Sequence, residues 1–409
     1  MVKAGALYFS IVIAFLIAVL SASIIMLAAH YHNSYLREVR FGRLNANMNS
    51  AMRLVLADTT LKQGMHKIDL FGDEVDSVHL HKDRWGVYEL IVLKTFVLQD
   101  TLVKNFLTGK LAEPEALYLR DEDRPLAISG DTRITGNIRI PKAGLKKSYA
   151  EGKPYSGDEM VYKGKAAYSE RTNETLDGDV IEELLERLRQ PMKGDQLEGA
   201  LMRVPFDGET KFILLPSDGR LTDVSISGKV ILFSDSAVVI ERSAKLNGVQ
   251  VFAPYINVMD GAELNGQFFA TDSISIGNGS RFSYPSVIGL LQEDTGKTSG
   301  QVNFGSHVQV EGIVFSYGKQ LGPLQQAINF GKDNLIHGEV YSTGIVKLEK
   351  GVQIKGKVSC SRFMMKTPTT LYENFLIDVK LNVKARSKYY LGSGLMRSDR
   401  ERKVLQWMD

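Results

Sequence analysis

A pair of histidines comes closest, in type and spacing, to what chemistry requires. His79 and His81 are two positions apart in an expected strand, so their side chains share one face, and two imidazoles can bind a metal ion. The pattern supplies no third ligand beside them. The acidic run 71–76 lacks the spacing of a calcium loop and is interpreted as a solvated turn. We therefore predict no metal site.

Carboxylates and a thiol are the remaining candidates for catalysis. Enzymes that cleave polysaccharides need paired acids on one face, whereas the acids of the second half fall at scattered positions. Cys360, the only cysteine, occupies a position that holds alanine or serine in related segments, so we interpret it as a packed small residue. We predict no catalytic residue and no cofactor, and keep a polysaccharide-acting enzyme as an alternative.

Composition limits the classes of protein further. With 409 residues the chain has room for about two or three domains. The formal net charge of +3 is nearly balanced and gives no argument for a nucleic-acid partner. The 37 glycines are typical of a chain with many tight turns between short strands.

The N-terminus predicts a membrane anchor. No charged residue occurs from Ala4 to Ala29, and about 20 apolar residues suffice to cross a bilayer. A cleaved signal peptide is the alternative, but its apolar region is normally about 7–15 residues long. We therefore expect an uncleaved single-pass helix with the lipid bilayer as a partner. Lys3 precedes this segment and several arginines follow it, so charge alone leaves its orientation open.

The helix is expected to continue as a stalk to Asp58. Apolar residues recur there at intervals of mostly three and four, which is typical of an amphipathic helix. Either this face packs on the protein's own domain, or it bundles with partner helices in a homo- or hetero-oligomer. The expected helix-packing residues are Leu36, Val39, Leu44, Met48, Met52 and Val55.

This layout resembles that of the type IV pilins and of the pseudopilins of type II secretion. In those families an apolar helix continues as an amphipathic stalk and enters a β-rich domain, as expected here for residues 4–58 and beyond. The resemblance implies a subunit of a pilus-like or secretion machine. The whole chain is also similar to membrane-anchored proteins of Bacteroidetes, a likeness that carries no function.

A short cassette recurs along the second half of the chain. An apolar residue, a spacer and a glycine lead into an alternating strand that ends on a small residue. Gly248 and Gly266 are 18 positions apart, as are Gly338 and Gly356. Such a period predicts stacked coils of a right-handed-type parallel β-helix, or solenoid, in which glycine forms each corner. An antiparallel β-sandwich is the alternative. The corner glycines are Gly136, Gly248, Gly266, Gly312, Gly338 and Gly356.

Four regions follow from these patterns. Within the third region, Asp179–Arg189 is expected to form a charged amphipathic helix. The basic tail is expected to cover the open end of the solenoid. The regions are 1–58, the transmembrane helix and stalk; 59–125, a small β-rich domain; 126–374, the β-solenoid with an insertion at 142–220; and 375–409, a C-terminal cap.

The repeats resemble those of the bactofilins, polymerising β-helices, over residues 126–141 and 224–360. We expect a bacterial inner-membrane protein with an extracytoplasmic C-terminal domain, acting as a structural or assembly component. One alternative is a cytoplasmic-side scaffold of the bactofilin type. Another is a surface protein that binds a polysaccharide or cell-envelope component in a groove lined by Tyr255, Tyr284 and Tyr317.

Overall fold

The computed structural model is mainly β, with one long N-terminal helix. It divides into two compact units: unit 1 comprises Met1–Lys82 and Val92–Lys104, and unit 2 comprises Asp83–Ile91 and Asn105–Asp409. The residues that the structure describes are 4–58, 60–70, 76–157, 161–189, 193–216, 218–294, 299–320, 325–366, 370–396 and 400–408.

Helix α1 (Ala4–Ala57) is 54 residues long, which corresponds to about 80 Å. The most apolar part of the helix has a mean hydropathy of 2.9, and none of it is buried within the protein. The helix is long and apolar enough to cross a membrane. Burial begins in the last turns, from Leu44 onward. Arg40 of this helix forms an ion pair with Asp100, also in unit 1, at 2.5 Å.

Antiparallel strands follow the helix. In unit 1, β1 (Gly64–Asp69) pairs with β2 (Asp76–Trp85), with His79 opposite Lys67. Strands β2, β3 (Tyr88–Val97) and β4 (Asp100–Leu111) contribute residues to both units. In unit 2, the C-terminal strands β31 (Leu391–Gly392) and β32 (Arg402–Met408) pair antiparallel with the end of β4.

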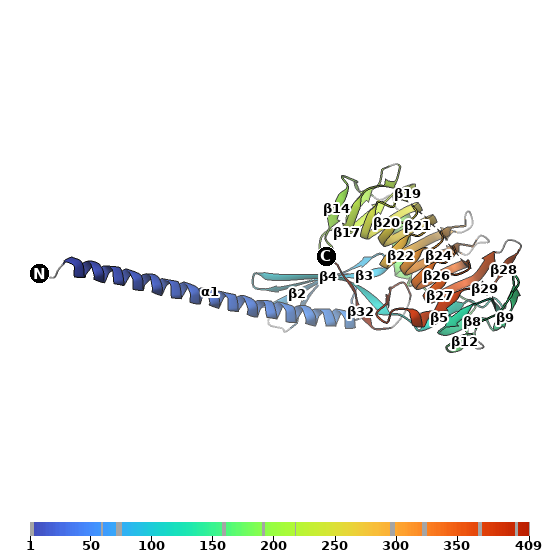
Figure 1. The fold of residues 1–409 in the computed structure, drawn as a ribbon, viewed down its shortest axis with the longest axis horizontal. Helices are drawn as coiled ribbons and strands as arrows, with labels where there is room; N and C mark the ends of the chain where they lie inside the picture. Colours follow the sequence, from blue (N-terminus) through green and yellow to red (C-terminus); the bar gives the residue numbers. More distant parts are fainter. Residues whose placement is uncertain are drawn as a thin grey trace. The chain divides into compact units, whose positions relative to one another are not determined.

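Most of unit 2 is a closed sheet whose strands pair almost entirely in parallel. Its longest strands pair in sequence order, and Ile336 of one lies beside Ile354 of the next, an offset of one 18-residue period. Figure 1 shows these strands following one another along the closed sheet of unit 2. They are β20 (Lys245–Val258), β21 (Glu263–Ile276), β22 (Arg281–Asp294), β24 (Gln309–Gln320), β26 (Leu335–Leu348) and β27 (Gln353–Lys366).

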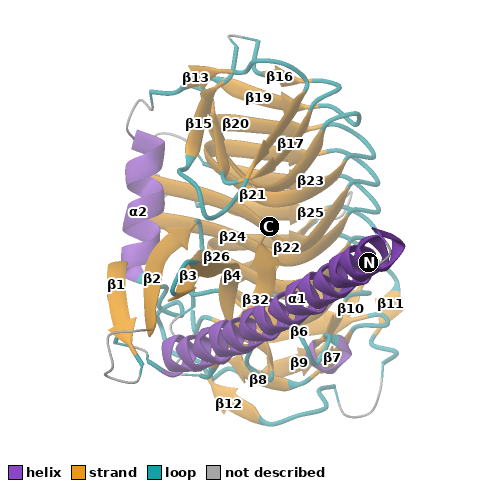
Figure 2. Ribbon diagram, turned by 90° about the vertical axis from the view of Figure 1, so that its left-hand side faces the viewer, coloured by secondary structure: helices purple, strands orange, loops and turns teal. Residues whose placement is uncertain are grey.

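Shorter strands complete the same sheet. Figure 2 shows β13 and β16 at one end of the strand stack and β12 at the other. Their bounds are β5 (Glu115–Leu119), β7 (Arg133–Thr135), β8 (Asn137–Ile140), β12 (Ala166–Tyr168), β13 (Asp195–Gln196), β14 (Leu201–Val204), β15 (Lys211–Leu214), β16 (Arg220–Leu221), β17 (Ser225–Gly228), β18 (Val230–Phe233), β19 (Ala237–Ile240), β23 (Gln301–Phe304), β25 (Ala327–Phe330), β28 (Leu371–Glu373) and β30 (Lys380–Asn382).

The core lies inside this closed sheet. Inward-facing residues of successive strands form columns, because parallel register places equivalent side chains about 4.8 Å apart. Every member of one such column is fully buried, and the column runs Val238, Ile256, Ile274, Val302, Ile328, Val346 and Phe363. Cys360 is buried in the same core, which matches its expected packing role.

The sheet is completed by segments from both ends of unit 2. Strand β30 pairs in parallel with β27 on one side and with β7 on the other. Strand β5 likewise lies between β27 and β8. A small parallel sheet alongside combines β29 (Phe375–Ile377), β6 (Leu126–Ser129) and β9 (Leu145–Lys147). Figure 1 shows the teal strands β5 and β8 next to the orange-red β27 and β29.

Several expectations can be compared with this architecture. The helix at Asp179–Arg189 is confirmed as α2 (Gly178–Arg189), which packs beside β20, β21 and β22 (Figure 2). The parallel pairing differs from the antiparallel sandwich alternative. Segment 142–220, expected as an insertion, contributes β12–β16 to the closed sheet and the hairpin of β10 (Tyr149–Ala150) and β11 (Lys153–Pro154). Its strands of two to four residues lack the cassette glycine, so the repeat pattern did not reveal them.

The tail 375–409 was expected to be a cap. Instead, β30 is an inner strand with partners on both sides, followed by a short 3-10 helix η1 (Val383–Ala385) and by β31 and β32, which join another sheet. The cause is that β27 leaves a free parallel edge, and the Leu381 side chain continues the apolar column of Ile354 beside it.

Candidate functional site

The expected helix-packing face is divided by burial. Leu44, Met48 and Val55 are at most 2% exposed, and Met52 is half-buried. Leu36 and Val39, nearer the apolar segment, are 39% and 50% exposed. The predicted face is therefore of two kinds. From Leu44 onward it is covered by other residues of this chain, whereas at Leu36 and Val39 it is exposed and available to a partner helix.

Five of the six expected corner glycines lie inside strands, because the long strands continue through the bend, whereas Gly136 lies between β7 and β8. Added Cβ atoms at Gly338 and Gly356 would collide with the backbone of the neighbouring strand, at Gly312 O and Gly338 O respectively. Gly136, Gly266 and Gly312 are similarly crowded. At Gly248 the nearest atom would be 3.5 Å away, so only its positive φ of +72° favours glycine there.

The histidine pair of unit 1 is not part of an acidic or sulfur-containing cluster among the described residues. His79 packs its ring 4.8 Å from that of Phe96, and both histidines are half-buried. The acidic run 71–76 falls almost wholly on positions outside the described residues. In the described part of the chain, the one group of three such side chains close enough to hold a metal ion is Glu113, Glu115 and Glu174.

This acidic group belongs to a larger cluster on the outside of the closed sheet in unit 2, which we call the Lys357 cluster: Glu113, Glu115, Glu174, Arg139 and Lys357. The Lys357 ammonium is 6% exposed and lies 3.2, 2.9 and 2.6 Å from the three carboxylates in that order. Arg139 binds Glu115 through two nitrogens, at 2.5 and 2.8 Å, and reaches Glu174 at 2.6 Å. Three negative charges thus face two positive ones.

The pKa shifts in the Lys357 cluster show that its groups stabilise one another in their charged forms. Burial raises the pKa of Glu115, but hydrogen bonds from Arg139 and the Lys357 charge outweigh it, so the pKa lies below its usual value. The pKa of Lys357 is raised despite its burial, because Glu174 and Glu115 favour the ammonium. The space between the carboxylates is filled by the ammonium rather than open to a metal. The arrangement ties β27, β5 and β8 to the segment carrying Glu174.

Glu339 extends the cluster toward the next strand, where it lies opposite Lys357 in register. Its carboxyl is buried, and burial raises its pKa, opposed by the charges of Arg386 and Lys357. The cavity beside Glu339 and Lys357 measures about 30 Å³, room for about one water molecule. This cavity is therefore too small to hold a saccharide.

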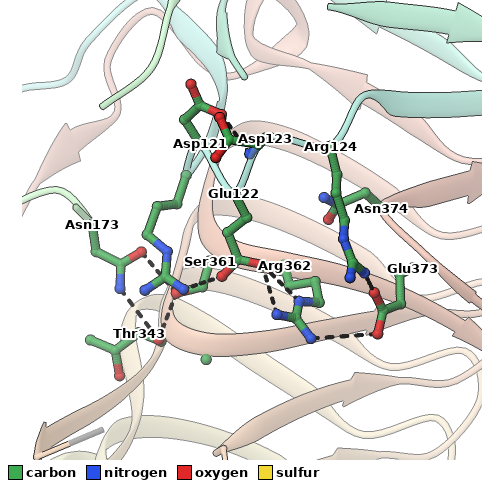
Figure 3. A network of polar contacts seen from close by, with 12 residues as sticks. Asp121, Glu122, Asp123, Arg124, Asn173, Thr343, Ser361, Arg362, Glu373 and Asn374 are labelled. Atoms are coloured by element: carbon green, nitrogen blue, oxygen red, sulfur yellow. Dashed lines mark hydrogen bonds and ion pairs between the residues drawn. The ribbon is translucent and has the colours of Figure 1, made fainter. Parts of the chain in front are cut away.

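A second network joins distant segments nearby. Figure 3 shows Arg362 of β27 between two carboxylates, donating to Glu122 at 2.9 and 2.7 Å and approaching Glu373 at 3.5 Å. Asn173 donates to the Thr343 carbonyl at 3.3 Å, and its own oxygen accepts from Ser361 at 2.9 Å. The charges of Arg362, Glu122 and Glu373 are paired with one another, which is typical of a structural role.

An accessible pocket lies close to Glu339, and we call it the tyrosine pocket. It has a volume of about 420 Å³, within the range of about 300–1,000 Å³ found for ligand sites. Residues of the sheet form one wall, and the segment after η1 forms the other. The lining residues are Tyr284, Glu311, His337, Arg386, Ser387, Tyr389, Tyr390 and Leu405.

Of the three tyrosines expected to line a binding groove, the structure places only Tyr284 in this pocket. Tyr255 is 46% exposed elsewhere, and Tyr317 is half-buried, with its carbonyl accepting from Gln326 at 2.9 Å. Sequence reasoning missed Tyr389, Tyr390 and Arg386. They were visible only as an Arg-x-x-Tyr-Tyr run in a tail interpreted as a basic cap.

Comparison with known proteins gives no relative for this chain: no family model, curated protein or solved structure matches it.

Proposed function

We propose that this protein is a single-pass membrane-anchored structural or assembly component that displays a β-solenoid head, in the manner of a pilin or pseudopilin. The observation that carries the proposal is the continuity of α1. One helix of 54 residues combines an uncovered apolar segment with a lower half whose apolar side chains are buried. An anchor thus passes without a break into the folded part of the chain.

The parallel register, with offsets of 17 or 18 residues between β20 and β21 and between β26 and β27, supports a solenoid head, which we propose to be of the right-handed type. Stacked coils with buried columns form a rigid body, because each coil is fixed by its neighbours on both sides. The ion pairs around Lys357 fit a scaffold better than a catalyst, since all three carboxylates of the cluster pair with the buried ammonium. We place the head outside the cytoplasm of a bacterium, anchored in the inner membrane.

Lateral packing of α1 would assemble the subunits. Leu36 and Val39 are exposed at 39% and 50%, directly beyond the apolar segment, and offer an apolar strip to a like helix. The deeper residues of the predicted face, such as Met48, are already buried and take no part in this contact.

Topology is tested with two reporter fusions after Asp409, one active only outside the cytoplasm and one fluorescent only inside it. We expect activity of the first and no signal from the second. The reverse result overturns the display function and favours a membrane-tethered scaffold on the cytoplasmic side.

Helix packing is tested by disulfide cross-linking in membranes. The chain suits this because its one native cysteine, Cys360, is fully buried and its thiol pKa is raised by burial. We expect Leu36→Cys and Val39→Cys to give cross-linked dimers on mild oxidation, while Met48→Cys, at a buried position, gives none. Equal cross-linking at all three positions, or at none, contradicts assembly through this face.

A further inference from the structure

We propose that the tyrosine pocket binds a saccharide unit that carries a carboxylate. Display on a membrane anchor does not require such a pocket, so this inference goes beyond the proposed function. It rests on three features of unit 2: a pair of adjacent, mutually tilted tyrosine rings, a guanidinium with an unused donor, and a cavity of about 420 Å³.

The aromatic wall fits a sugar ring. Tyr284 and Tyr390 lie with ring centroids 5.5 Å apart and planes tilted by 56°. The Tyr284 hydroxyl donates a hydrogen bond to the Leu391 carbonyl at 2.9 Å, and the Tyr390 hydroxyl donates to the Gly312 carbonyl at 3.3 Å. These bonds to the backbone fix the rings in place. Tyr389 is 78% exposed at the mouth of the pocket. The faces of such rings are weakly negative and attract the polarised C–H groups of a sugar.

Arg386 provides the anion-binding group. One terminal nitrogen, Nη2, donates to the Glu113 carbonyl at 2.8 Å, and the guanidinium lies 5.1 Å from the Tyr390 ring centroid. The other, Nη1, is buried and has no hydrogen-bond partner within the described residues. A planar guanidinium matches a carboxylate in two-point geometry, so a carboxylate would satisfy this donor after a small side-chain movement.

Charges of both signs lie around the pocket: Arg386, Lys355 and Lys388 are basic, whereas Glu311 lines the pocket and the buried Glu339 interacts with Arg386. Lys388 is exposed, and its Nζ lies 5.0 Å from the Tyr389 ring centroid. Lys355 lies beside His337 in register, and burial together with that lysine lowers the pKa of the imidazole. Glu311, exposed on the adjacent strand, can accept hydrogen bonds from sugar hydroxyls. In the proposed complex Arg386 holds the carboxylate, and His337 and Glu311 serve the sugar hydroxyls.

The test uses the full chain in detergent micelles and isothermal titration calorimetry. The probes are a glucuronate-containing tetrasaccharide and a neutral glucose tetrasaccharide, with an acidic peptide of equal charge as a third ligand. We expect the uronate probe to bind at least about tenfold more tightly than the neutral one. Equal binding of the two saccharides, tighter binding of the peptide, or no binding of any probe overturns the proposal.

Substitutions of pocket residues test whether the saccharide binds in this pocket. Arg386→Gln should weaken uronate binding at least about tenfold while leaving neutral binding unchanged, and Tyr389→Ala should weaken both. Tyr168→Ala is the matched control, since Tyr168 is 70% exposed on β12 and does not line the pocket. Circular dichroism confirms that each variant is folded. Uronate binding that survives both pocket variants, or that is lost equally in the control, places the site elsewhere.

Discussion

The backbone N–H of Asp131 donates a hydrogen bond to the Asp378 carboxylate at 2.9 Å, although 247 residues separate the two in the chain. This contact lies where β30 enters between β27 and β7. One layer of the sheet is therefore built from the end of the chain, and the layers after it are built from residues of the first half of the chain. The sheet reaches completion only when residues 375–382 have joined it.

Replacing Asp378 should weaken this closure. The Asp378→Ala change removes the acceptor of Asp131 N and of the Lys153 ammonium, which lies 2.8 Å away. We expect a loss of about 1–2 kcal/mol in the free energy of unfolding, as for a part-buried donor left without its partner. Denaturant unfolding of the detergent-solubilised chain, followed by circular dichroism, measures this value.

Acid should narrow the difference between Asp378→Ala and the unmodified chain, leaving the backbone penalty of alanine at the positive φ of residue 378, +55°. Burial raises the pKa of Asp378, but hydrogen bonds from Lys153 and Asp131 outweigh it, and the folded pKa lies below its usual 3.8. The stability that this group contributes is present above pH 3.8 and is lost as pH falls through the folded pKa. Asp235→Ala, at an exposed position, is the control and should change stability by less than about 0.5 kcal/mol. A loss of equal size in both variants contradicts the closing role.

The sequence predicted the helices and the stacked strands because both have a period. α2 and the buried lower part of α1 follow the 3.6-residue pattern, and the cassette glycines Gly248 and Gly266, like Gly338 and Gly356, are 18 positions apart. The layers made by β12–β16 were not predicted, since two to four residues give too little alternation to detect. Pairing of β30 with β7 joins two distant segments, and a single sequence contains no signal for it.

The Lys357 cluster escaped prediction for a related reason. Lys357 lies next to the cassette glycine, where the equivalent residue of the previous strand is Glu339. A polar residue there normally faces solvent, as on any outward side of a strand. Only the folded structure brings Glu113, Glu115 and Glu174 over this position and converts an exposed site into a buried ion-pair network. Whether a charged side chain is buried depends on contacts with distant parts of the chain, so the residues next to Lys357 in the sequence do not reveal it.

Removing the central cation should therefore be costly. In Lys357→Met the methionine keeps the length of the side chain but leaves three carboxylates with only Arg139 to balance them. We expect a loss of about 3–5 kcal/mol, typical of breaking a buried ion pair from one side. Because crowded carboxylates bind protons more readily, the loss should shrink between pH 7.5 and pH 5. Lys245→Met, at an exposed position, serves as the control. A pH-independent loss would contradict the electrostatic origin.

Glu339 should behave in the opposite sense. Burial raises its folded pKa above the usual 4.5, so its contribution to stability is fully present below pH 4.5 and is lost as pH rises through the folded pKa. Glu339→Gln removes the charge while keeping the shape. We expect the variant to be more stable than the unmodified chain at pH 8 by on the order of 1 kcal/mol, with the difference vanishing near pH 4. Thermal unfolding at both values measures this. A less stable variant at pH 8 would show that Glu339 acts as an ionised partner of Arg386 and Lys357.

The crowded glycines offer a test of the strand stack itself. Gly338→Ala and Gly248→Ala both place a methyl group at a positive φ, but only at Gly338 would the new Cβ collide with the neighbouring backbone, at Gly312 O. We expect Gly248→Ala to cost about 1 kcal/mol, the usual penalty of that backbone conformation. Gly338→Ala should cost several times more, since the strands must also separate. The two midpoints of denaturant unfolding give the comparison directly, and equal costs at both glycines would mean that adjacent strands do not approach this closely in solution.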